Sequence, residues 1–269
     1  MRYLSLFLTI FLLLLSASIN AGTIDPAIPD SKYLSYGSKH ECVVEIHTTQ
    51  DAGDKVKIHG SASAVIVTPD IVLTAAHVVV GTKNAKIVLK NGEVIEIESY
   101  VFPKLFITLK PNDYSCAYDI AVCKLKKSAK IDFYPKLYSE KDEVGKVCSI
   151  AGFGFSGKYN SNVFKNDRKK RAGSNIIDTI IDDTLICSVG KGQETSLEFM
   201  INSGDSGGGL FIDKKLAGIN SSIYKINNNN IFDHSRHVRV SLHKNWIDSI
   251  IKLFDKIDEF EDSRNVDLE

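Results

Sequence analysis

Short runs of alternating apolar and polar residues, separated by turn residues, recur along most of this chain. Clear examples are residues 42–46, 62–67 and 71–73, with Gly, Asp and Pro between them. The sharpest pair is 85–89 and 94–97, because the Asn-Gly that joins these two runs favours a β-hairpin turn. Many short strands with few helical stretches predict antiparallel β-barrels.

The alternation stops near both ends of the chain. Residues 22–40 are polar and contain two prolines, which predicts an extended N-terminal arm. After Ser241 the period becomes helical, which predicts a C-terminal helix followed by a frayed acidic tail at 255–269. The apolar stripe of that helix consists of Leu242, Trp246, Ile250, Ile251 and Phe254.

Residues 1–21 have a pattern of their own. A basic Arg2 precedes an apolar run at 4–15, and small residues follow up to Ala21. This pattern is typical of a secretory signal peptide, here cut after Ala21, and the run is too short for a stable membrane span. The alternative is an anchor that stays uncleaved. We expect a secreted protein, periplasmic or extracellular, without stable membrane association.

Charge excludes one class of partner. The 269 residues contain 33 Lys and Arg against 33 Asp and Glu, so the formal net charge is zero. Nothing in this balance attracts nucleic acid, and we expect none as a partner. Two basic stretches, 124–136 and 168–171, are expected to be solvated, the second within an exposed loop at 156–174. A processing cut in that loop is the alternative for the second stretch.

The stretch 203–210 reads Ser-Gly-Asp-Ser-Gly-Gly-Gly-Leu and holds the strongest candidate for chemistry. A serine hydroxyl is a useful nucleophile only with a base, an oxyanion site and room for substrate. Glycines beside Ser206 let a carbonyl group approach the backbone closely, and the N–H groups of Gly204 and Ser206 can stabilise one oxyanion. The alternative is a Gly-rich turn without a chemical role.

His77 follows Thr-Ala-Ala, and Asp119 precedes Ile-Ala-Val, each beside an apolar run. His, then Asp, then Ser within Gly-Asp-Ser-Gly-Gly is the order of the chymotrypsin/trypsin-like serine peptidases, which the chain resembles from about residue 41 onward. The resemblance implies Ser206 as nucleophile, His77 as general base and acid, and Asp119 as orienter of the imidazole. It also implies an oxyanion hole formed by Gly204 and Ser206.

The resemblance implies an all-β, chymotrypsin-like fold of two antiparallel six-stranded β-barrels with a C-terminal α-helix. We expect the first barrel at 41–135, with the histidine and the aspartate. The second barrel, with the serine and the specificity pocket, is expected at 136–240, and the helix and tail at 241–269.

The expected activity is hydrolysis of protein or peptide substrates through an acyl-enzyme, by a monomer that needs no metal or cofactor. One alternative is a non-catalytic relative that binds proteins on the same scaffold, although such relatives typically lose a residue of the triad. An esterase or lipase of the α/β-hydrolase type conflicts with the order, because His comes last in that fold.

The resemblance also assigns substrate contacts. Met200, six residues before the nucleophile, falls at the base of the pocket for the side chain before the cut bond. Ser221, Ser222 and Ile223 fall on the strand edge along which substrate backbone pairs. Because Met200 carries no charge and Ile223 is bulky, we expect a shallow pocket that accepts Ala, Val or Leu. A shifted loop that brings Glu198 to the pocket would instead favour Lys or Arg.

Activation is where the chain departs from the family. Trypsin-like zymogens are cut before an Ile-Val-Gly-Gly-like start, and the new amino group pairs with the aspartate before the serine. Asp205 is present here, but no such start is found. One hypothesis is that signal removal, or a second cut near Lys32, supplies the ammonium group. The alternative is that Asp205 binds other donors and no activating cut exists.

The five cysteines are an odd number for a chain bound for an oxidising compartment, so at least one stays unpaired. We expect disulfide bonds but cannot assign the pairs, and no C-x-x-C spacing indicates a metal site. The six other histidines form no ligand-like cluster and are expected at the surface or in local hydrogen bonds. The cysteines are Cys42, Cys116, Cys123, Cys148 and Cys187.

Overall fold

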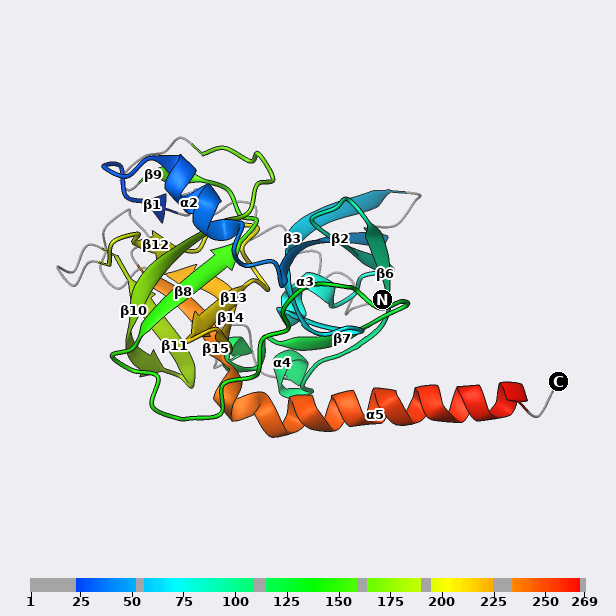
Figure 1. Ribbon diagram of the computed structural model, residues 1–269. Helices are drawn as coiled ribbons and strands as arrows, with labels where there is room; N and C mark the ends of the chain where they lie inside the picture. The colour runs from blue at the N-terminus through cyan, green and yellow to red at the C-terminus, as the bar shows by residue number, and fades with distance from the viewer. Residues whose placement is uncertain are drawn as a thin grey trace.

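The computed structural model describes residues 23–51, 56–108, 115–158, 164–189, 195–224 and 234–266, so the predicted signal peptide lies outside the described residues. Two closed six-stranded barrels stand side by side, and a long C-terminal helix runs along one side of both (Figure 1). The predicted fold class is confirmed.

The first barrel has the strand order β2-β3-β4-β7-β6-β5, with antiparallel neighbours. Its strands are β2 (Val43–Asp51), β3 (Lys57–Thr68), β4 (Ile71–Thr74), β5 (Asn84–Val88), β6 (Val94–Val101) and β7 (Ala121–Leu125).

The second barrel has the order β10-β11-β15-β14-β13-β8, again with antiparallel neighbours. Its strands are β8 (Val147–Gly152), β10 (Arg171–Ile181), β11 (Thr184–Ser188), β13 (Gly209–Ile212), β14 (Lys215–Tyr224) and β15 (His234–Arg239).

The hairpin predicted around Asn-Gly is present. Val88 pairs with Val94, and the Leu89 N–H donates to the Glu93 carbonyl at 2.8 Å. Gly92 has a φ of 85°, a left-handed conformation that glycine adopts without steric cost. The turn therefore fixes the register of β5 and β6.

Alternate residues of the strands fill the barrels. Ile46, Ile66 and Leu73 of the first barrel are fully buried, as are Ile150 and Leu185 of the second. One core cluster contains residues of both barrels, so the apolar packing continues across their interface. Burying such side chains stabilises the fold by about 1.5–3 kcal/mol each.

The N-terminal arm is not simply extended, as the sequence suggested. It contains β1 (Thr23–Ile24) and a helix, α2 (Asp30–Gly37), which lies over the second barrel (Figure 1). Strand β1 lies between β12 (Phe199–Met200) and β9 (Gly157–Lys158) in a small third sheet. The helix begins directly after Pro29, which cannot donate a backbone hydrogen bond.

The basic stretch 168–171 was expected in an exposed loop, and that expectation is wrong for the last two residues of the stretch. Arg171 opens β10, is 4% exposed, and binds the carboxylates of Asp30 and Asp167. Lys170 donates to the carbonyl oxygens of His40 and Val43. These two cations therefore attach neighbouring segments to the second barrel instead of facing solvent.

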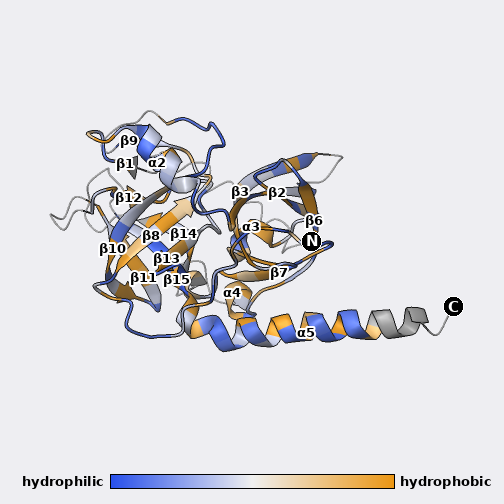
Figure 2. Cartoon of the chain, viewed as in Figure 1, coloured by the Kyte–Doolittle hydropathy of each residue, from blue (hydrophilic) through white to orange (hydrophobic). Residues whose placement is uncertain are grey.

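The acidic tail also differs from expectation. Helix α5 spans Val240–Val266 and alternates hydrophobic and hydrophilic bands along its length (Figure 2). Lys124 of β7, in the stretch expected to be solvated, is 6% exposed and binds Asp70 and Asp258. This ion pair holds the second half of α5 against the first barrel.

Two short helices lie between β6 and β7, namely α4 (Leu105–Thr108) and η1 (Ser115–Tyr118). All five cysteines are free thiols, so the expected disulfide bonds are not found; Cys148 Sγ lies 3.9 Å from Cys187 Sγ. Within the described ranges, no helix has the length and apolar character needed to cross a membrane.

Candidate active site

His77 and Asp119 are brought together by two neighbouring strands of the first barrel. His77 lies in α3 (Ala76–Val79), directly after β4, and Asp119 lies just before β7. Strands β4 and β7 are paired with Thr74 opposite Ala121, so the two side chains meet at one edge of the barrel.

The Asp119 carboxylate holds the imidazole by two bonds. His77 Nδ1 lies 2.7 Å from Oδ2, and the His77 backbone N–H donates to Oδ1 at 2.9 Å. An ionised carboxylate only accepts hydrogen bonds, so Nδ1 carries the proton and Nε2 is left as the acceptor. The imidazole side chain is 36% exposed, which gives a substrate access to Nε2.

The pKa values of this pair follow from its burial and its charges. Burial alone would raise the pKa of Asp119, yet the neighbouring His77 and the bond from Ser221 hold that pKa below its usual value. For His77, burial acts to lower the pKa, but the Asp119 charge outweighs it and raises that pKa. Each partner therefore favours the charged form of the other.

Ser221 of β14 links the serine to this pair. Its hydroxyl donates to Asp119 Oδ2 at 2.6 Å, and its carbonyl oxygen accepts from Ser206 Oγ at 3.5 Å. Among the described residues, Ser206 Oγ has no hydrogen bond to the imidazole. Such bonds are often long in ligand-free enzymes and shorten when substrate binds.

The Ser206 turn is fastened to the first barrel through Ser63 of β3, which the sequence reasoning did not single out. The Ser63 hydroxyl donates to the Gly204 carbonyl and accepts from the Phe153 N–H, both at 2.9 Å. Its backbone N–H donates to the Ser206 carbonyl at 2.9 Å. Ser63 thus ties both barrels to the serine.

The backbone around Ser206 leaves two N–H groups available. Gly204 and Gly207 have φ values of 92° and 82°, which side-chain-bearing residues rarely adopt. The N–H groups of Gly204 and Ser206 have no partner in the part of the chain that the structure describes. Two adjacent free donors at a tight turn form a suitable site for an oxyanion.

Asp205 lies beneath this turn and is 2% exposed. Its carboxylate accepts from the N–H groups of Gly154 and Asn202, at 2.7 and 2.8 Å. A Cβ atom built on Gly152 or Gly154 would lie 2.2 or 2.4 Å from the Asp205 carboxyl group, so both positions require glycine. Burial raises the pKa of Asp205 to about 7.

Asn220 of β14 supports the turn from the other side and was also missed by the sequence reasoning. Its Nδ2 donates to the carbonyl oxygens of Ala151 and Asp205, and its own carbonyl accepts from the Gly207 N–H. His237 Nδ1 lies 2.9 Å from Asn220 Oδ1, and burial lowers the pKa of His237 to about 3. His237 is therefore neutral and donates to Asn220.

Three of the six histidines expected at the surface or in local hydrogen bonds are in fact buried, namely His234, His237 and His243. His237 Nδ1 bonds to Asn220 inside the second barrel, and Nε2 of His243, in α5, bonds to the Ala117 carbonyl. No signal in the sequence separates these from exposed histidines, because strand alternation does not reveal which polar partner lies opposite.

The predicted substrate contacts differ in exposure. Ser222 and Ile223 are partly exposed on β14, next to Ser221. Met200 is fully buried in β12, where it pairs with Thr23 of the arm. Glu198 is 6% exposed. Met200 is therefore not exposed to a substrate in this conformation.

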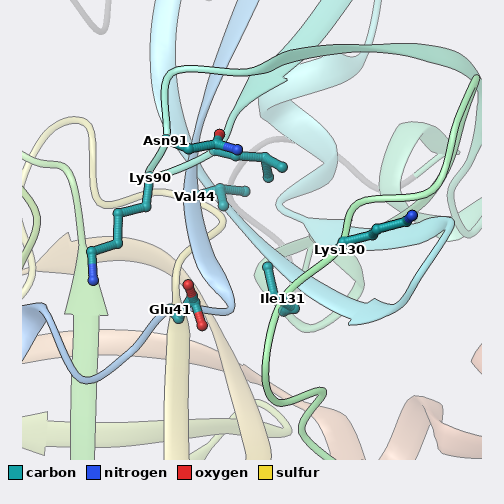
Figure 3. Close-up of a pocket in the computed structure, with 7 residues that line it drawn as sticks. Glu41, Val44, Lys90, Asn91, Lys130 and Ile131 are labelled. Atoms are coloured by element: carbon teal, nitrogen blue, oxygen red, sulfur yellow. The ribbon is translucent and has the colours of Figure 1, made fainter.

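A pocket of about 320 Å³ lies elsewhere, on the first barrel (Figure 3). It contains none of the residues gathered around Ser206, and its walls mix two lysines with an acid and apolar side chains. The residues that line it are Glu41, Val44, Leu89, Lys90, Asn91, Lys130 and Ile131.

Known proteins share this architecture. The family description Trypsin matches residues 37–247. Among solved structures, neuropsin, a serine protease expressed in the limbic system of mouse brain, is 19% identical with a TM-score of 0.60, over 79% of this chain and 95% of its own. The HL collagenase is 18% identical with a TM-score of 0.60, over 79% and 94%.

The scabies mite inactivated protease paralogue S-D1 is also 18% identical with a TM-score of 0.60, over 80% of this chain and 94% of its own. At such identities the structures establish the fold, and the family description covers most of the chain. The protein therefore belongs to the trypsin family of serine endopeptidases.

Proposed function

We propose that this protein is a secreted endopeptidase that hydrolyses peptide bonds through an acyl-enzyme on Ser206. The observation that carries the proposal is the pair of hydrogen bonds from His77 to the Asp119 carboxylate, one from Nδ1 and one from the backbone N–H. The Ser221 hydroxyl donates a third hydrogen bond to the same carboxylate. This arrangement fixes the imidazole tautomer that can accept a proton at Nε2.

The proposed reaction has two halves. Ser206 Oγ attacks the substrate carbonyl carbon while His77 Nε2 takes the hydroxyl proton, and the N–H groups of Gly204 and Ser206 stabilise the oxyanion. His77 then gives this proton to the leaving amine, which departs. Water then attacks the acyl carbonyl carbon while His77 Nε2 takes a proton from the water, the ester bond to Ser206 Oγ breaks, and His77 returns this proton to Oγ as the product acid departs.

The residues before the cut bond are proposed to pair with β14 at Ser221, Ser222 and Ile223. Met200, the residue proposed at the base of the pocket, carries no charge, and a buried guanidinium without a partner is destabilised by several kcal/mol. We therefore propose small or medium apolar side chains, Ala, Val or Leu, before the cut bond.

A non-catalytic binding protein on the same scaffold is the second candidate. One observation favours it: Ser206 Oγ is directed at the Ser221 carbonyl and not at the imidazole. Against it, Ser206, His77 and Asp119 are all present, and the last two are bonded to each other.

Labelling with a fluorophosphonate separates the two candidates, because this reagent reacts only with an activated serine. We expect labelling of the mature chain at Ser206 and none in Ser206→Ala. The matched control is Ser203→Ala, which removes an exposed hydroxyl of the same loop and should label normally. An unlabelled wild-type chain that still binds peptides would establish the binding protein instead.

A further inference from the structure

The proposed oxyanion site depends on the orientation of three consecutive peptide groups. The first carries the Gly204 N–H and the third carries the Ser206 N–H, so the peptide group between Gly204 and Asp205 joins the two donors. Gly204 has a φ of 92° and no Cβ, so steric contacts alone do not fix the orientation of this middle peptide group. Its orientation therefore has to come from hydrogen bonds.

The outer two peptide groups are held from the side of the second barrel. The Ser203 carbonyl accepts from the Phe155 N–H at 2.9 Å. The Asp205 carbonyl accepts from the Gly208 N–H at 2.9 Å and from Asn220 Nδ2 at 3.2 Å. The C=O and N–H of a trans peptide group point in opposite directions, so each of these bonds also sets the direction of one oxyanion donor.

The middle peptide group is held from the first barrel, by Ser63 of β3. The Ser63 hydroxyl donates to the Gly204 carbonyl and accepts from the Phe153 N–H, both at 2.9 Å. A carbonyl only accepts and a backbone N–H only donates, so the direction of the hydroxyl proton is fixed. Ser63 is fully buried, so solvent does not compete for these bonds.

The backbone of Ser63 is itself firmly placed. The pairing of β3 with β4 begins only at Val65, so the Ser63 backbone is open toward the serine turn. Its N–H donates to the Ser206 carbonyl at 2.9 Å, and its carbonyl accepts from the Thr74 hydroxyl at 2.8 Å. Thr74 lies three residues before His77. Ser63 therefore connects the strand that leads to the histidine with the turn that carries the serine.

We propose that Ser63 is a positioning residue of the oxyanion site, an inference that rests on the proposed function. Its hydroxyl holds the Gly204 carbonyl so that the N–H groups of Gly204 and Ser206 face one substrate oxygen. Among the bonds of the described residues, none joins Ser63 to Ser206 Oγ, so its effect passes through the peptide groups. The first barrel thus aligns two donors that belong to the second.

The size of the effect follows from what Ser63→Ala leaves in place. Loss of one oxyanion donor typically lowers kcat by about 10²–10³. Ser63→Ala keeps both donors but frees the peptide group between them, so we expect kcat to fall by about 10–100-fold. KM should change by less than about threefold, because the oxyanion forms only in the transition state. The pH midpoint of kcat/KM should stay the same, because the bonds between His77 and Asp119 are untouched.

The test compares the wild-type chain with Ser63→Ala and with a matched control, Thr184→Val. Thr184 is also fully buried, and its hydroxyl donates to a backbone carbonyl, that of Ile181, at 2.6 Å. This bond lies in the hairpin of β10 and β11. The readouts are kcat and KM on a peptide substrate, the rate of fluorophosphonate labelling, the melting temperature, and the backbone amide NMR signals.

We expect both variants to melt at a lower temperature than the wild-type chain, since each loses one buried hydroxyl. Only Ser63→Ala should lose kcat and label at least about 10-fold more slowly. The amide signals of Gly204 and Ser206 should shift in Ser63→Ala and stay in place in Thr184→Val. A wild-type kcat in Ser63→Ala, or an equal loss of kcat in Thr184→Val, would overturn the inference.

Two outcomes call for a second measurement. If the wild-type chain is not labelled, the proposed function fails, and the amide signals decide the inference alone: unchanged Gly204 and Ser206 signals in Ser63→Ala would exclude the positioning role. If Ser63→Ala does not fold, Ser63→Cys takes its place, because a thiol keeps the shape but is a weak donor and acceptor. Labelling of Ser63→Cys at least about threefold slower supports the inference, and an unchanged rate overturns it.

Discussion

Replacing Asn220 by Ala should harm both stability and turnover, because this side chain connects a buried histidine to the nucleophile turn. Asn220 is fully buried and makes three side-chain bonds, to the Ala151 and Asp205 carbonyls and to His237 Nδ1. Each such bond contributes about 1 kcal/mol net. We expect a loss of about 3 kcal/mol in the free energy of unfolding.

For a chain of this size, that loss lowers the melting temperature by about 6–12 °C. Turnover should fall by about 10–100-fold, because the substitution removes the Nδ2 bond to the Asp205 carbonyl, directly before Ser206, and a small displacement of a nucleophile is costly. The assays are thermal unfolding and kcat on a peptide substrate, measured well below the melting transition.

Asn175→Ala is the matched control. Asn175 is also a buried asparagine of the second barrel, and it donates to the Phe199 carbonyl, away from the serine turn. It should lose stability but keep kcat within about threefold. A double variant, Asn220→Val with His237→Phe, should recover only the stability lost at the bond between these two side chains, because the Ala151 and Asp205 carbonyls still lack their donor, and kcat should stay low. An unchanged kcat in Asn220→Ala would refute the reasoning.

Three further predictions concern the reaction. Ser206→Ala and His77→Ala should each lower kcat by about 10⁴–10⁶, and the double variant by little more, because the two side chains act as one unit; near-normal turnover in either would contradict the assignment. Cleavage of a mixed peptide library should occur after Ala, Val or Leu. Dominant cuts after Lys or Arg would contradict the proposed preference for apolar side chains. The Asp119 charge raises the pKa of His77, so kcat/KM should fall as pH decreases through a midpoint above the ordinary value for histidine. A midpoint below that value, determined from the pH profile, would contradict the structure.

Local patterns were enough to predict the barrels and to single out the three residues that we propose as the triad. Strand alternation, the Asn-Gly turn and the short motifs around His77, Asp119 and Ser206 each lie within a few neighbouring residues. Barrel closure then places the ends of β4 and β7 together, so the pairing of His77 with Asp119 follows from strand order.

The arm and the basic stretch could not be predicted in this way, because their partners are distant in sequence. Arg171 binds Asp30, 141 residues away, and Tyr33 binds the Glu198 carbonyl, 165 residues away. Buried charges of this kind are indistinguishable by composition from solvated ones. Ser63 and Asn220 were missed for the same reason, since the role of a polar residue in a strand depends on partners that are distant in sequence.

The ion pair between Lys124 and Asp258 couples the two barrels mechanically through helix α5. Helix α5 follows directly from β15 of the second barrel, yet Lys124 belongs to β7 of the first. The chain runs from the arm on the second barrel into β2 of the first barrel and returns to the second barrel after β7, and α5 then crosses back to the first barrel. Phe254, 7% exposed, packs in the core cluster that spans both barrels. The opening between His77 and Ser206, which come from different barrels, therefore has a stiffness set in part by a contact on a helix that carries no residue of the site.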